Sequence, residues 1–538
     1  MRGADLVAKA LAQAGTKTVF SLSGNQIMPI YDACIDAGIR IHHTRHEAAA
    51  GYMADAFAQV TGEVGIQLIT AAPGFANALS PLYSALKAES PMVMLSGDSS
   101  RGQDGMGAFQ ELDQVAMSTP VTKLSFRSRS AAGLGHDIAR AIRIAKSDRP
   151  GPVHIALPFG FLNDDASDGT VPGAEAFHPE VQIPESGLIA AALDVLKSAQ
   201  RPMIITGPAL NPSRAGRAVD GGLAALAEAL DAPVTAMESP RGLNDPCLGD
   251  FASALAKADV IMSLGKSLDF TTGFAKAPAM SSDARFVVID PDAADIERAR
   301  RALGDRLVIA GRGDSGATAQ AFVKSGHGGD KRAVWAADVA AAKSARPQTP
   351  TGGKPMHPAE LCAAVQKILD DADDPILVVD GGEFGQWAQA CISAPTRVIN
   401  GISGAIGGGI CYGIAAQLAR PDATVVVLMG DGTAGFHFGE FETAHRYGAN
   451  VIGIIGHDAR WNAEYQIQLR DYGPNRLYEC ELDATDYGAA AAGFGCHGEM
   501  VDDPADLASA LARAEESGKA ACVAVAIEGV LAPSGASH

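Results

Sequence analysis

Two carboxylates stand at the ends of neighbouring apolar segments in the last third of the chain. The apolar residues 425–429 run directly into a Gly-Asp-Gly turn at 430–432, and a second run, "VIGII", is followed by Gly-His-Asp, ending at Asp458. Because ligands bind beyond the carboxyl ends of parallel strands, we expect Asp431 and Asp458 at one edge of a sheet. The glycines let a phosphate approach the backbone, and a helix expected over about 438–447 would direct its N-terminus at that anion.

Asp431 is not suited to binding the phosphate itself, because like charges repel. A divalent cation between them removes this conflict, and Mg²⁺ commonly shares its six oxygen ligands between protein and substrate phosphates. A tight turn without a ligand would also explain the Gly-Asp-Gly sequence. The second carboxylate, 27 positions later at the end of the next strand, favours the metal site.

This order of a Gly-Asp-Gly turn, a helix, a strand and a metal-binding side chain resembles the binding motif of the thiamine-diphosphate enzymes. In that family the second metal ligand is usually the latter residue of an Asn-Asn pair, whereas this chain has His457-Asp458. The resemblance implies that Mg²⁺ is bound by Asp431, Asp458 and the backbone carbonyl of Arg460. The extra carboxylate leaves the metal preference open, but not the cofactor.

Two further stretches resemble the family. In "NGISGAIGGGICYGIAA", Ile406 matches the bulky residue that bends the cofactor into a V, and Gly404 matches the carbonyl that accepts a hydrogen bond from its aminopyrimidine. An ordinary core isoleucine at a helix start is the alternative explanation. The other stretch is "DGGEFGQW", residues 380–387. The remaining cofactor contacts that the resemblance implies on the diphosphate and substrate side are Gly382, Glu383, Phe384, Gly430, Gly432 and Thr433.

The phrase "TRHEAAAGYMADAFA" places Glu47 at a helix start after a strand. It resembles the family's segment whose glutamate hydrogen-bonds the pyrimidine ring and drives proton removal from the cofactor. The expected chemistry is acid–base catalysis in a dry site, where burial raises a carboxyl pKa toward neutrality. A glutamate that only stabilises the helix dipole is the alternative. His42, His43 and His46 beside it are interpreted mainly as structural.

Other residues of the first segment also match the family. Asn77 corresponds to a residue near the pyrimidine ring, and Phe109 and Gln110 to residues that face the reacting carbon from the partner subunit. Gln26 stands where some relatives place a histidine, so one proton shuttle is missing. In the family the cofactor bridges two subunits, which implies a homodimer or homotetramer with active sites at the subunit interface.

The chain as a whole predicts an α/β fold with three doubly wound parallel-sheet domains, because near-continuous apolar runs alternate with helical stretches. We expect a pyrimidine-binding domain over 1–165, a central domain over 186–343 and a diphosphate- and Mg-binding domain over 356–530. Polar linkers are expected over 163–187 and about 344–357. Candidate strands begin at Thr18, Ile66, Met92, Val153, Met203, Pro233, Val260, Phe286, Ile376, Thr424, Val451 and Cys522.

Composition narrows the class of partner. The net charge of −19 argues against binding nucleic acid, because no basic excess exists to neutralise phosphates. No apolar run approaches the roughly 18 residues needed to span a bilayer, and the N-terminus is too polar for a signal peptide. Eight scattered cysteines without a CxxC pair suggest buried free thiols. We therefore expect a cytoplasmic protein that binds neither nucleic acid nor a membrane. The resemblance implies that its substrate is a small 2-oxo acid or 2-hydroxyacyl thioester.

The resemblance is to acetolactate synthase large subunits, which implies decarboxylation of a 2-oxo acid followed by carboligation to a second carbonyl. "GGEF" and "GHDARWNAEYQIQLRDYG" look more like a 2-hydroxyacyl-CoA lyase, and a simple 2-oxo acid decarboxylase is a further alternative. "GKSLDFTTGF" lacks the arginines of FAD-binding synthases, so FAD is not expected and a central domain without nucleotide is preferred. A cofactor-binding regulatory homologue is the non-enzymatic alternative, against which Glu47 argues. A nucleotide-binding protein on a similar sheet is disfavoured because no GxxxxGKS loop is present.

Overall fold

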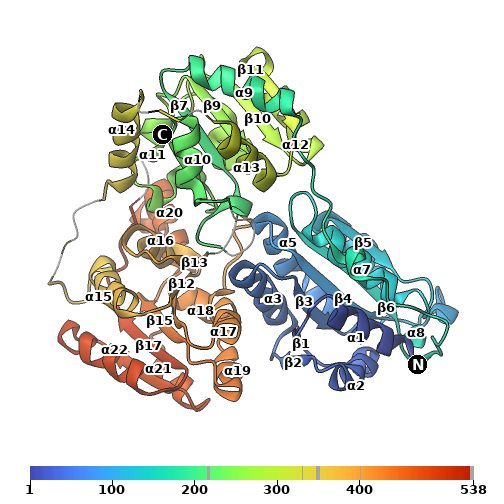
Figure 1. The fold of residues 1–538 in the computed structure, drawn as a ribbon. Helices are drawn as coiled ribbons and strands as arrows, with labels where there is room; N and C mark the ends of the chain where they lie inside the picture. The colour runs from blue at the N-terminus through green and yellow to red at the C-terminus, as the bar shows by residue number, and fades with distance from the viewer. Residues whose placement is uncertain are drawn as a thin grey trace. The chain divides into compact units, whose positions relative to one another are not determined.

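The computed structural model describes residues 1–533 except 215–218, 327, 330, 347–349, 351 and 400–401, so part of the second expected linker lies outside it. Three parallel β-sheets, each with helices on its faces, form the fold (Figure 1). Every pairing between the named strands is parallel. The predicted α/β class with three doubly wound sheets is therefore confirmed.

The first sheet has the strand order β2-β1-β3-β4-β6-β5. Its strands are β1 (Thr18–Ser21), β2 (Arg40–His43), β3 (Gly65–Ile69), β4 (Met92–Asp98), β5 (Leu124–Arg127) and β6 (Pro152–Pro158). Its helices are α1 (Gly3–Gln13), α2 (Met28–Asp36), α3 (Glu47–Thr61), α4 (Pro73–Asn77), α5 (Leu79–Ala88), α6 (Gln114–Ser118), α7 (Leu134–Lys146) and α8 (Phe159–Asn163), with a 3-10 turn η1 (Asn25–Ile27). Residues of β3, β4 and β6 are buried throughout, as strands covered on both faces must be.

The second sheet has the order β11-β10-β9-β7-β8. Its strands are β7 (Pro202–Thr206), β8 (Val234–Ala236), β9 (Val260–Leu264), β10 (Arg285–Asp290) and β11 (Leu307–Arg312). Its helices are α9 (Ser186–Ser198), α10 (Gly222–Leu230), α11 (Phe251–Leu255), α12 (Ala293–Leu303), α13 (Ser315–Ser325) and α14 (Ala333–Ser344). Two separate hydrophobic clusters, one containing Phe251 and Phe286 and the other Ile204 and Phe322, pack with alternate residues of these strands. Alternation of this kind shows that both faces of the sheet are covered.

The third sheet has the order β13-β12-β14-β15-β17-β16. Its strands are β12 (Pro375–Val379), β13 (Thr396–Ile399), β14 (Thr424–Gly430), β15 (Ile452–His457), β16 (His497–Val501) and β17 (Ala521–Ala526). Its helices are α15 (Pro358–Asp371), α16 (Gly382–Cys391), α17 (Gly409–Ala419), α18 (Asp431–Ala434), α19 (Glu440–Tyr447), α20 (Asn462–Tyr472), α21 (Tyr487–Ala492) and α22 (Leu507–Glu516). Gly430 of β14 pairs with Gly456 of β15, which places the residues after both strands at one edge.

The expected helix over about 438–447 corresponds to α19, but a shorter helix, α18, precedes it. Gly430 is extended, with ψ 160°, and the chain turns into helix at Asp431 itself. The Asp431 carboxylate accepts a hydrogen bond from the Gly432 N–H, which satisfies one of the amides that a helix start leaves unpaired. The metal-binding candidate is therefore the first residue of a helix.

The chain forms two compact units that do not follow the order of the sequence. Unit 1 contains residues 1–180, 410–421 and 437–450, and unit 2 contains 181–409, 422–436 and 451–538. Each expected domain range, 1–165, 186–343 and 356–530, encloses one sheet, and we keep these ranges as proposed domain limits. Helices α17 and α19, however, belong to the unit built around the first sheet.

Buried polar contacts hold α17 and α19 within unit 1. The hydroxyl of Tyr412 donates to the buried Asp55 carboxylate at 3.2 Å, and its ring meets that of Tyr52 edge-on at 5.6 Å. The backbone N–H of Arg45 donates to the Glu440 carboxylate at 3.0 Å. These helices are therefore attached to α3 and to the loop before it by specific contacts as well as by apolar burial.

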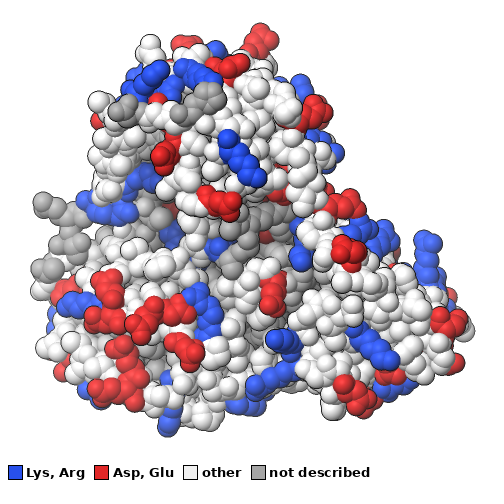
Figure 2. All heavy atoms as spheres, in the orientation of Figure 1, with Lys and Arg blue, Asp and Glu red and all other residues white. Residues whose placement is uncertain are grey.

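The surface carries the acidic excess of the sequence unevenly. On the face shown in Figure 2, acidic side chains gather over the part of the chain around α15 and α22.

All eight cysteines are free thiols, and six of them are buried. A search of the described residues found no helix both long and apolar enough to cross a membrane.

Candidate active site

Asp431 is held in place by three neighbours at the edge of the third sheet. Its side chain is 2% exposed; one oxygen, Oδ1, accepts from the Gly432 N–H at 2.8 Å, and the other, Oδ2, lies 2.9 Å from Nδ1 of His457. The Tyr487 hydroxyl donates to the Asp431 carbonyl at 3.2 Å. The carboxylate has a fixed partner on each oxygen and its backbone carbonyl a third, so it has one orientation, as a metal ligand requires.

Asp458 follows β15 and lies close enough to Asp431 for their charges to interact. Burial, and then the charge of Asp431, raise the pKa of Asp458 to about 7. Two carboxylates that repel one another in a buried site favour a bound cation. Ala459, with φ 54°, turns the chain between Asp458 and Arg460.

Arg460 supplies a backbone oxygen at this turn. In the part of the chain that the structure describes, no hydrogen bond is made to the Arg460 carbonyl, while its guanidinium lies 4.4 Å from the ring centre of Tyr465. The described residues contain no cluster of three or more His, Cys, Asp or Glu that could hold a metal. A hard cation at Asp431 and Asp458 would therefore take further oxygens from this carbonyl, water or a ligand's phosphate.

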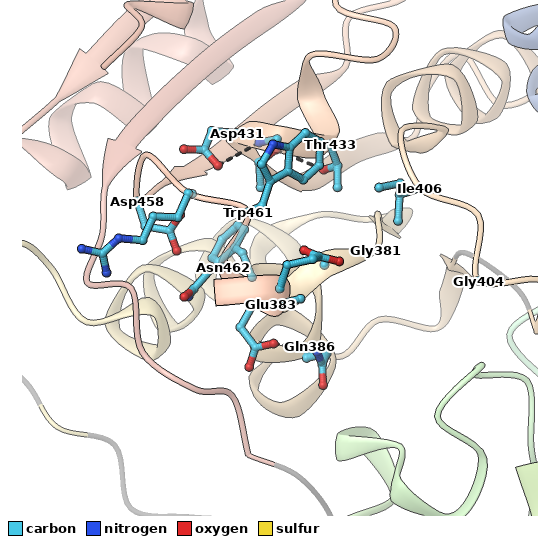
Figure 3. A pocket seen from close by; sticks show the side chains of 18 of the residues that line it. Gly381, Glu383, Gln386, Gly404, Ile406, Asp431, Thr433, Asp458, Trp461 and Asn462 are labelled. Carbon is cyan, nitrogen blue, oxygen red and sulfur yellow. Dashed lines mark hydrogen bonds between the residues drawn. The ribbon is translucent and has the colours of Figure 1, made fainter. Parts of the chain in front are cut away.

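These residues line one pocket within unit 2, of about 350 Å³, a size typical of small-molecule sites. Figure 3 shows Asp431 and Thr433 on one side, Asp458 near Trp461, and Glu383 with Gln386 on the other side. The predicted cofactor and metal residues that line it are Gly382, Glu383, Phe384, Gly404, Ile406, Gly430, Asp431, Gly432, Thr433, Asp458 and Arg460. The sequence patterns thus identified residues that share a single cavity.

The absence of a side chain has different structural consequences at the different glycines of the pocket. A Cβ on Gly430 would have no atom nearer than 4.0 Å, and Gly404, with φ 71°, has none within 4 Å. Both therefore leave open space where a ligand can meet the backbone. A Cβ on Gly432 would instead lie 2.8 Å from the Trp461 ring, so this glycine is required for packing.

The far side of the pocket is built by α16. Glu383 is 7% exposed and accepts hydrogen bonds from the Ala532 N–H at 2.5 Å and from Gln386 at 3.0 Å. Burial raises the pKa of Glu383. Phe384 belongs to the core and lies where a side chain on Gly456 would be, so it supports β15 as well as lining the pocket. Arg241, from the segment after β8, also lines the pocket and was not identified from the sequence.

Glu47 lies in unit 1, where it is the first residue of α3, directly after a strand and a short loop, as predicted. Its side chain is half-buried, and Asn77 donates to its Oε2 at 3.0 Å. A Cβ on Gly74 would lie 3.1 Å from the other oxygen, Oε1. Asn77 therefore orients the carboxylate, and Gly74 keeps the space beside Oε1 open.

The other predicted residues of the first segment form a connected group. The side-chain amide of Gln26 donates to Gln110 Oε1 at 2.5 Å, and the Thr70 hydroxyl donates to Gln26 Oε1 at 2.6 Å. Phe109 is 78% exposed. Thr70 was not identified from the sequence, although its place directly after β3 puts it at the edge where ligands bind.

The neighbouring histidines have structural contacts. His42 packs against the rings of Phe20 and Tyr447, and burial together with the charges of nearby arginines lowers its pKa to about 4. His46 accepts a hydrogen bond from the Ala48 N–H and caps α3. These contacts favour a structural role for His42 and His46, and the role of His43 stays a prediction.

Comparisons with known proteins cover all three sheets. Domain families described as thiamine pyrophosphate enzyme match residues 1–117 (N-terminal TPP binding domain), 189–312 (central domain) and 380–525 (C-terminal TPP binding domain). The chain is 32% identical to a probable acetolactate synthase of Mycobacterium bovis, over 98% of this chain and 95% of that protein. It is 29% identical to 2-hydroxyacyl-CoA lyase 2 of Homo sapiens, over 93% and 85%.

Proposed function

This chain belongs to the thiamine pyrophosphate enzyme family, and we propose that it is a Mg²⁺-dependent carboligase of that family. The proposed reaction decarboxylates a 2-oxo acid and joins the remaining acyl unit to a second carbonyl. The observation that carries the proposal is the edge of the third sheet, where Asp431 and Asp458 lie beside the open backbone of Gly430. The 32% identity to an acetolactate synthase favours this reaction among those of the family.

The residues of unit 2 fit the cofactor's charged end. Asp431, Asp458 and the Arg460 carbonyl would hold Mg²⁺, and Gly430 with Thr433 would lie against the diphosphate. Gly404 and Ile406, on the same pocket, would bind the aminopyrimidine side. Thiamine diphosphate, when bound, supplies a nucleophilic carbon that adds to the substrate carbonyl and accepts the electrons released with CO₂.

Glu47 is the proposed proton carrier. Asn77 fixes Oε2, while Oε1 has no hydrogen-bond donor among the described residues and faces the space left by Gly74. The carboxyl group can therefore give and take a proton at Oε1 without losing its orientation. Gln110 and Phe109 are proposed to face the substrate, and Gln26 to hold Gln110 in place.

We further propose a homodimer or homotetramer in which Glu47 of one subunit and Asp431 of another complete each active site. The two residues belong to different compact units, which is compatible with a site shared between chains. The proposed enzyme is cytoplasmic, binds neither nucleic acid nor membrane, and has no FAD. The net charge of −19 supports the first of these exclusions, because a nucleic-acid partner would be repelled.

A 2-hydroxyacyl-CoA lyase is the second candidate function. It is favoured by the 29% identity to 2-hydroxyacyl-CoA lyase 2 over 93% of this chain. A lyase would use the same Glu47 and metal site, but it would cleave a 2-hydroxyacyl-CoA into an aldehyde and formyl-CoA and would release no CO₂.

The test is an activity screen of the purified protein loaded with thiamine diphosphate and Mg²⁺. Pyruvate, larger 2-oxo acids and 2-hydroxyacyl-CoA thioesters are offered with and without an aldehyde acceptor. CO₂ and acetolactate formed from pyruvate would support the proposed carboligase. Aldehyde and formyl-CoA formed from a thioester would replace it by the lyase. Cofactor binding without any turnover would contradict both and favour a regulatory homologue.

A further inference from the structure

Three neighbouring strands of the first sheet each deliver one polar side chain to the same edge. Gln26 lies in η1 after β1, Thr70 directly follows β3, and Gln110 lies in the loop after β4. The strands are adjacent in the order β1-β3-β4, so residues 44 and 84 positions apart in the sequence meet. This is the edge at which ligands bind in such sheets.

The hydrogen bonds along this group have a direction. The Thr70 hydroxyl donates to Gln26 Oε1 at 2.6 Å, which turns the amide so that Gln26 Nε2 donates to Gln110 Oε1 at 2.5 Å. An amide has an accepting and a donating end, so fixing one end fixes the other. Gln110 Oε1 is thereby occupied, and Gln110 Nε2 has no partner among the described residues. The group at Gln110 that is left for a ligand is therefore the Nε2 donor.

The backbone at Gln110 is constrained as well. Its φ is 60°, a left-handed conformation that costs a non-glycine residue energy. The loop that imposes it is tied together by the Glu111 carboxylate, which accepts from the N–H groups of Gly105, Gly107 and Ala108. The side chain of Gln26, 5% exposed, is equally restricted. The Gln110 amide thus has little freedom once Thr70 has set its orientation.

The group also lies beside Glu47. A Cβ on Gly74 would be 2.7 Å from Cγ2 of Thr70 and 3.1 Å from Oε1 of Glu47, so both groups border the same small space. Thr70, the first residue of the hydrogen-bonded group, therefore lies beside the proton-carrying carboxylate. The donor at the other end of the group, Gln110 Nε2, suits an oxygen that becomes negative when a carbonyl is attacked.

We propose that Thr70 is a positioning residue which, acting through Gln26, directs Gln110 Nε2 toward the oxygen of the carbonyl substrate. This inference rests on the proposed function, because it requires a carbonyl substrate beside Glu47.

The test compares Thr70→Val, which removes the hydroxyl at nearly constant shape, with Thr70→Ser, which keeps it. With pyruvate as the probe, Thr70→Val is expected to lower kcat by about tenfold with little change in KM, since the Gln110 donor that Thr70 orients acts in the transition state. Thr70→Ser should retain most of the activity. Equal losses in both variants, or a loss confined to KM, would overturn the proposal.

A double-mutant cycle separates positioning from simple support of the fold. In a Gln110→Ala background, Thr70→Val should cause no further loss, because the residue through which it acts is gone. Additive losses would contradict the proposal. Thr206→Val is the matched control: it is a buried threonine ending β7 in the second sheet, and its substitution should leave kcat unchanged.

A crystal structure of Thr70→Val tests the positioning role of Thr70 separately from the proposed reaction. The Gln26 and Gln110 amides are expected to leave their present arrangement in Thr70→Val and to keep it in Thr70→Ser. Unchanged amides in Thr70→Val would overturn the positioning role even in an active enzyme. Displaced amides in a protein that turns over no 2-oxo acid would instead show that the positioning is real and that the proposed reaction is wrong.

Discussion

Glu47 and Asn77 form the two-residue group to which we assign proton transfer. Asn77 binds one oxygen of the carboxylate at 3.0 Å and leaves the other facing open space. Glu47→Ala should therefore retain thiamine diphosphate binding and lose activity by about 10²–10⁴-fold, the range of general acid–base catalysis. Calorimetric titration with the cofactor and a turnover assay on the same preparation measure both quantities. Activity that survives the substitution would exclude the proposed proton transfer.

The two carboxylates of unit 2 are predicted to contribute unequally to metal binding. Asp431 has three fixed partners, so Asp431→Ala should abolish Mg²⁺-dependent cofactor binding, as EDTA should in the wild type. Asp458→Asn keeps an oxygen ligand and should preserve that binding. Titration of each variant with thiamine diphosphate, with and without Mg²⁺, measures the difference. Complete loss in Asp458→Asn would show that its charge has a role beyond ligation.

Sequence spacing predicted the residues that lie on turns after interior strands, such as Asp431 and Asp458. It did not predict Thr70 or His457 as hydrogen-bond partners, because neither residue type is diagnostic at its position. Their roles depend on which side chains of other strands face them, and that is decided by the assembled sheet. Trp461 was missed for the same reason: it matters because it fills the space beside Gly432.

At the scale of elements, the start of α18 contains two glycines with opposite requirements. Gly430→Ala should fold normally but weaken cofactor binding, because its methyl group would enter the open pocket. Gly432→Ala should destabilise the fold by about 1–3 kcal/mol, the usual cost of overpacking, since its methyl group would meet the Trp461 ring. Thermal unfolding and cofactor titration of the pair measure both effects. Equal cofactor affinities for Gly430→Ala and the wild type would contradict a close approach of the cofactor to the backbone at Gly430.

The prediction of strands succeeded in sheet interiors and failed mostly at the edges. All interior strands of the three sheets were candidates, because strands buried on both faces have near-continuous apolar runs. The five strands absent from the candidates are β2, β5, β11, β13 and β16, all of them edge strands with mixed burial. Only β2 was implied, by the motif that contains Glu47. Edge strands are half-exposed, so their composition differs little from that of loops.

At the scale of the whole molecule, a buried ion-pair group links the segment after β8 to β13. The Glu238 carboxylate accepts from Arg397 at 2.6 Å and from Arg214 at 3.2 Å, and it is 2% exposed. Although burial opposes it, the charges of Arg397 and then Arg214 lower the pKa of Glu238. Removing the carboxylate would leave two arginines without their shared partner.

Glu238→Gln is therefore expected to destabilise the protein by about 3–5 kcal/mol near neutral pH. Because the folded-state pKa of Glu238 is lowered, its contribution is present above the unfolded value of about 4.3 and disappears as the pH falls through the folded value. Denaturant midpoints of the two proteins should thus converge in acid. Glu175→Gln, at a side chain 92% exposed, is the control and should change little. A constant difference across this pH range would contradict the pairing.

Subunit sharing of the active site can be tested by mixing two inactive variants. If Glu47 and Asp431 of different chains form each site, a hybrid of Glu47→Ala and Asp431→Ala subunits has one intact site. Unfolding, mixing and refolding should then restore about a quarter of wild-type activity, because about half of the dimers are hybrids with one of two sites intact. A mixture that stays inactive, with hybrids confirmed by mass, would place both residues in one chain's own site.

A chain that passes five times between its compact units cannot be divided by a single cut. A gene fragment ending at residue 180 would lack α17 and α19, and so would uncover Tyr52 and Asp55, which now meet Tyr412. Such a fragment is expected to aggregate or be retained by chaperones. Exchange of whole domains with a relative would have to carry 410–421 and 437–450 together with the first 180 residues. A domain exchange that takes only the first 180 residues would therefore replace the partners of α17 and α19 while leaving these helices behind.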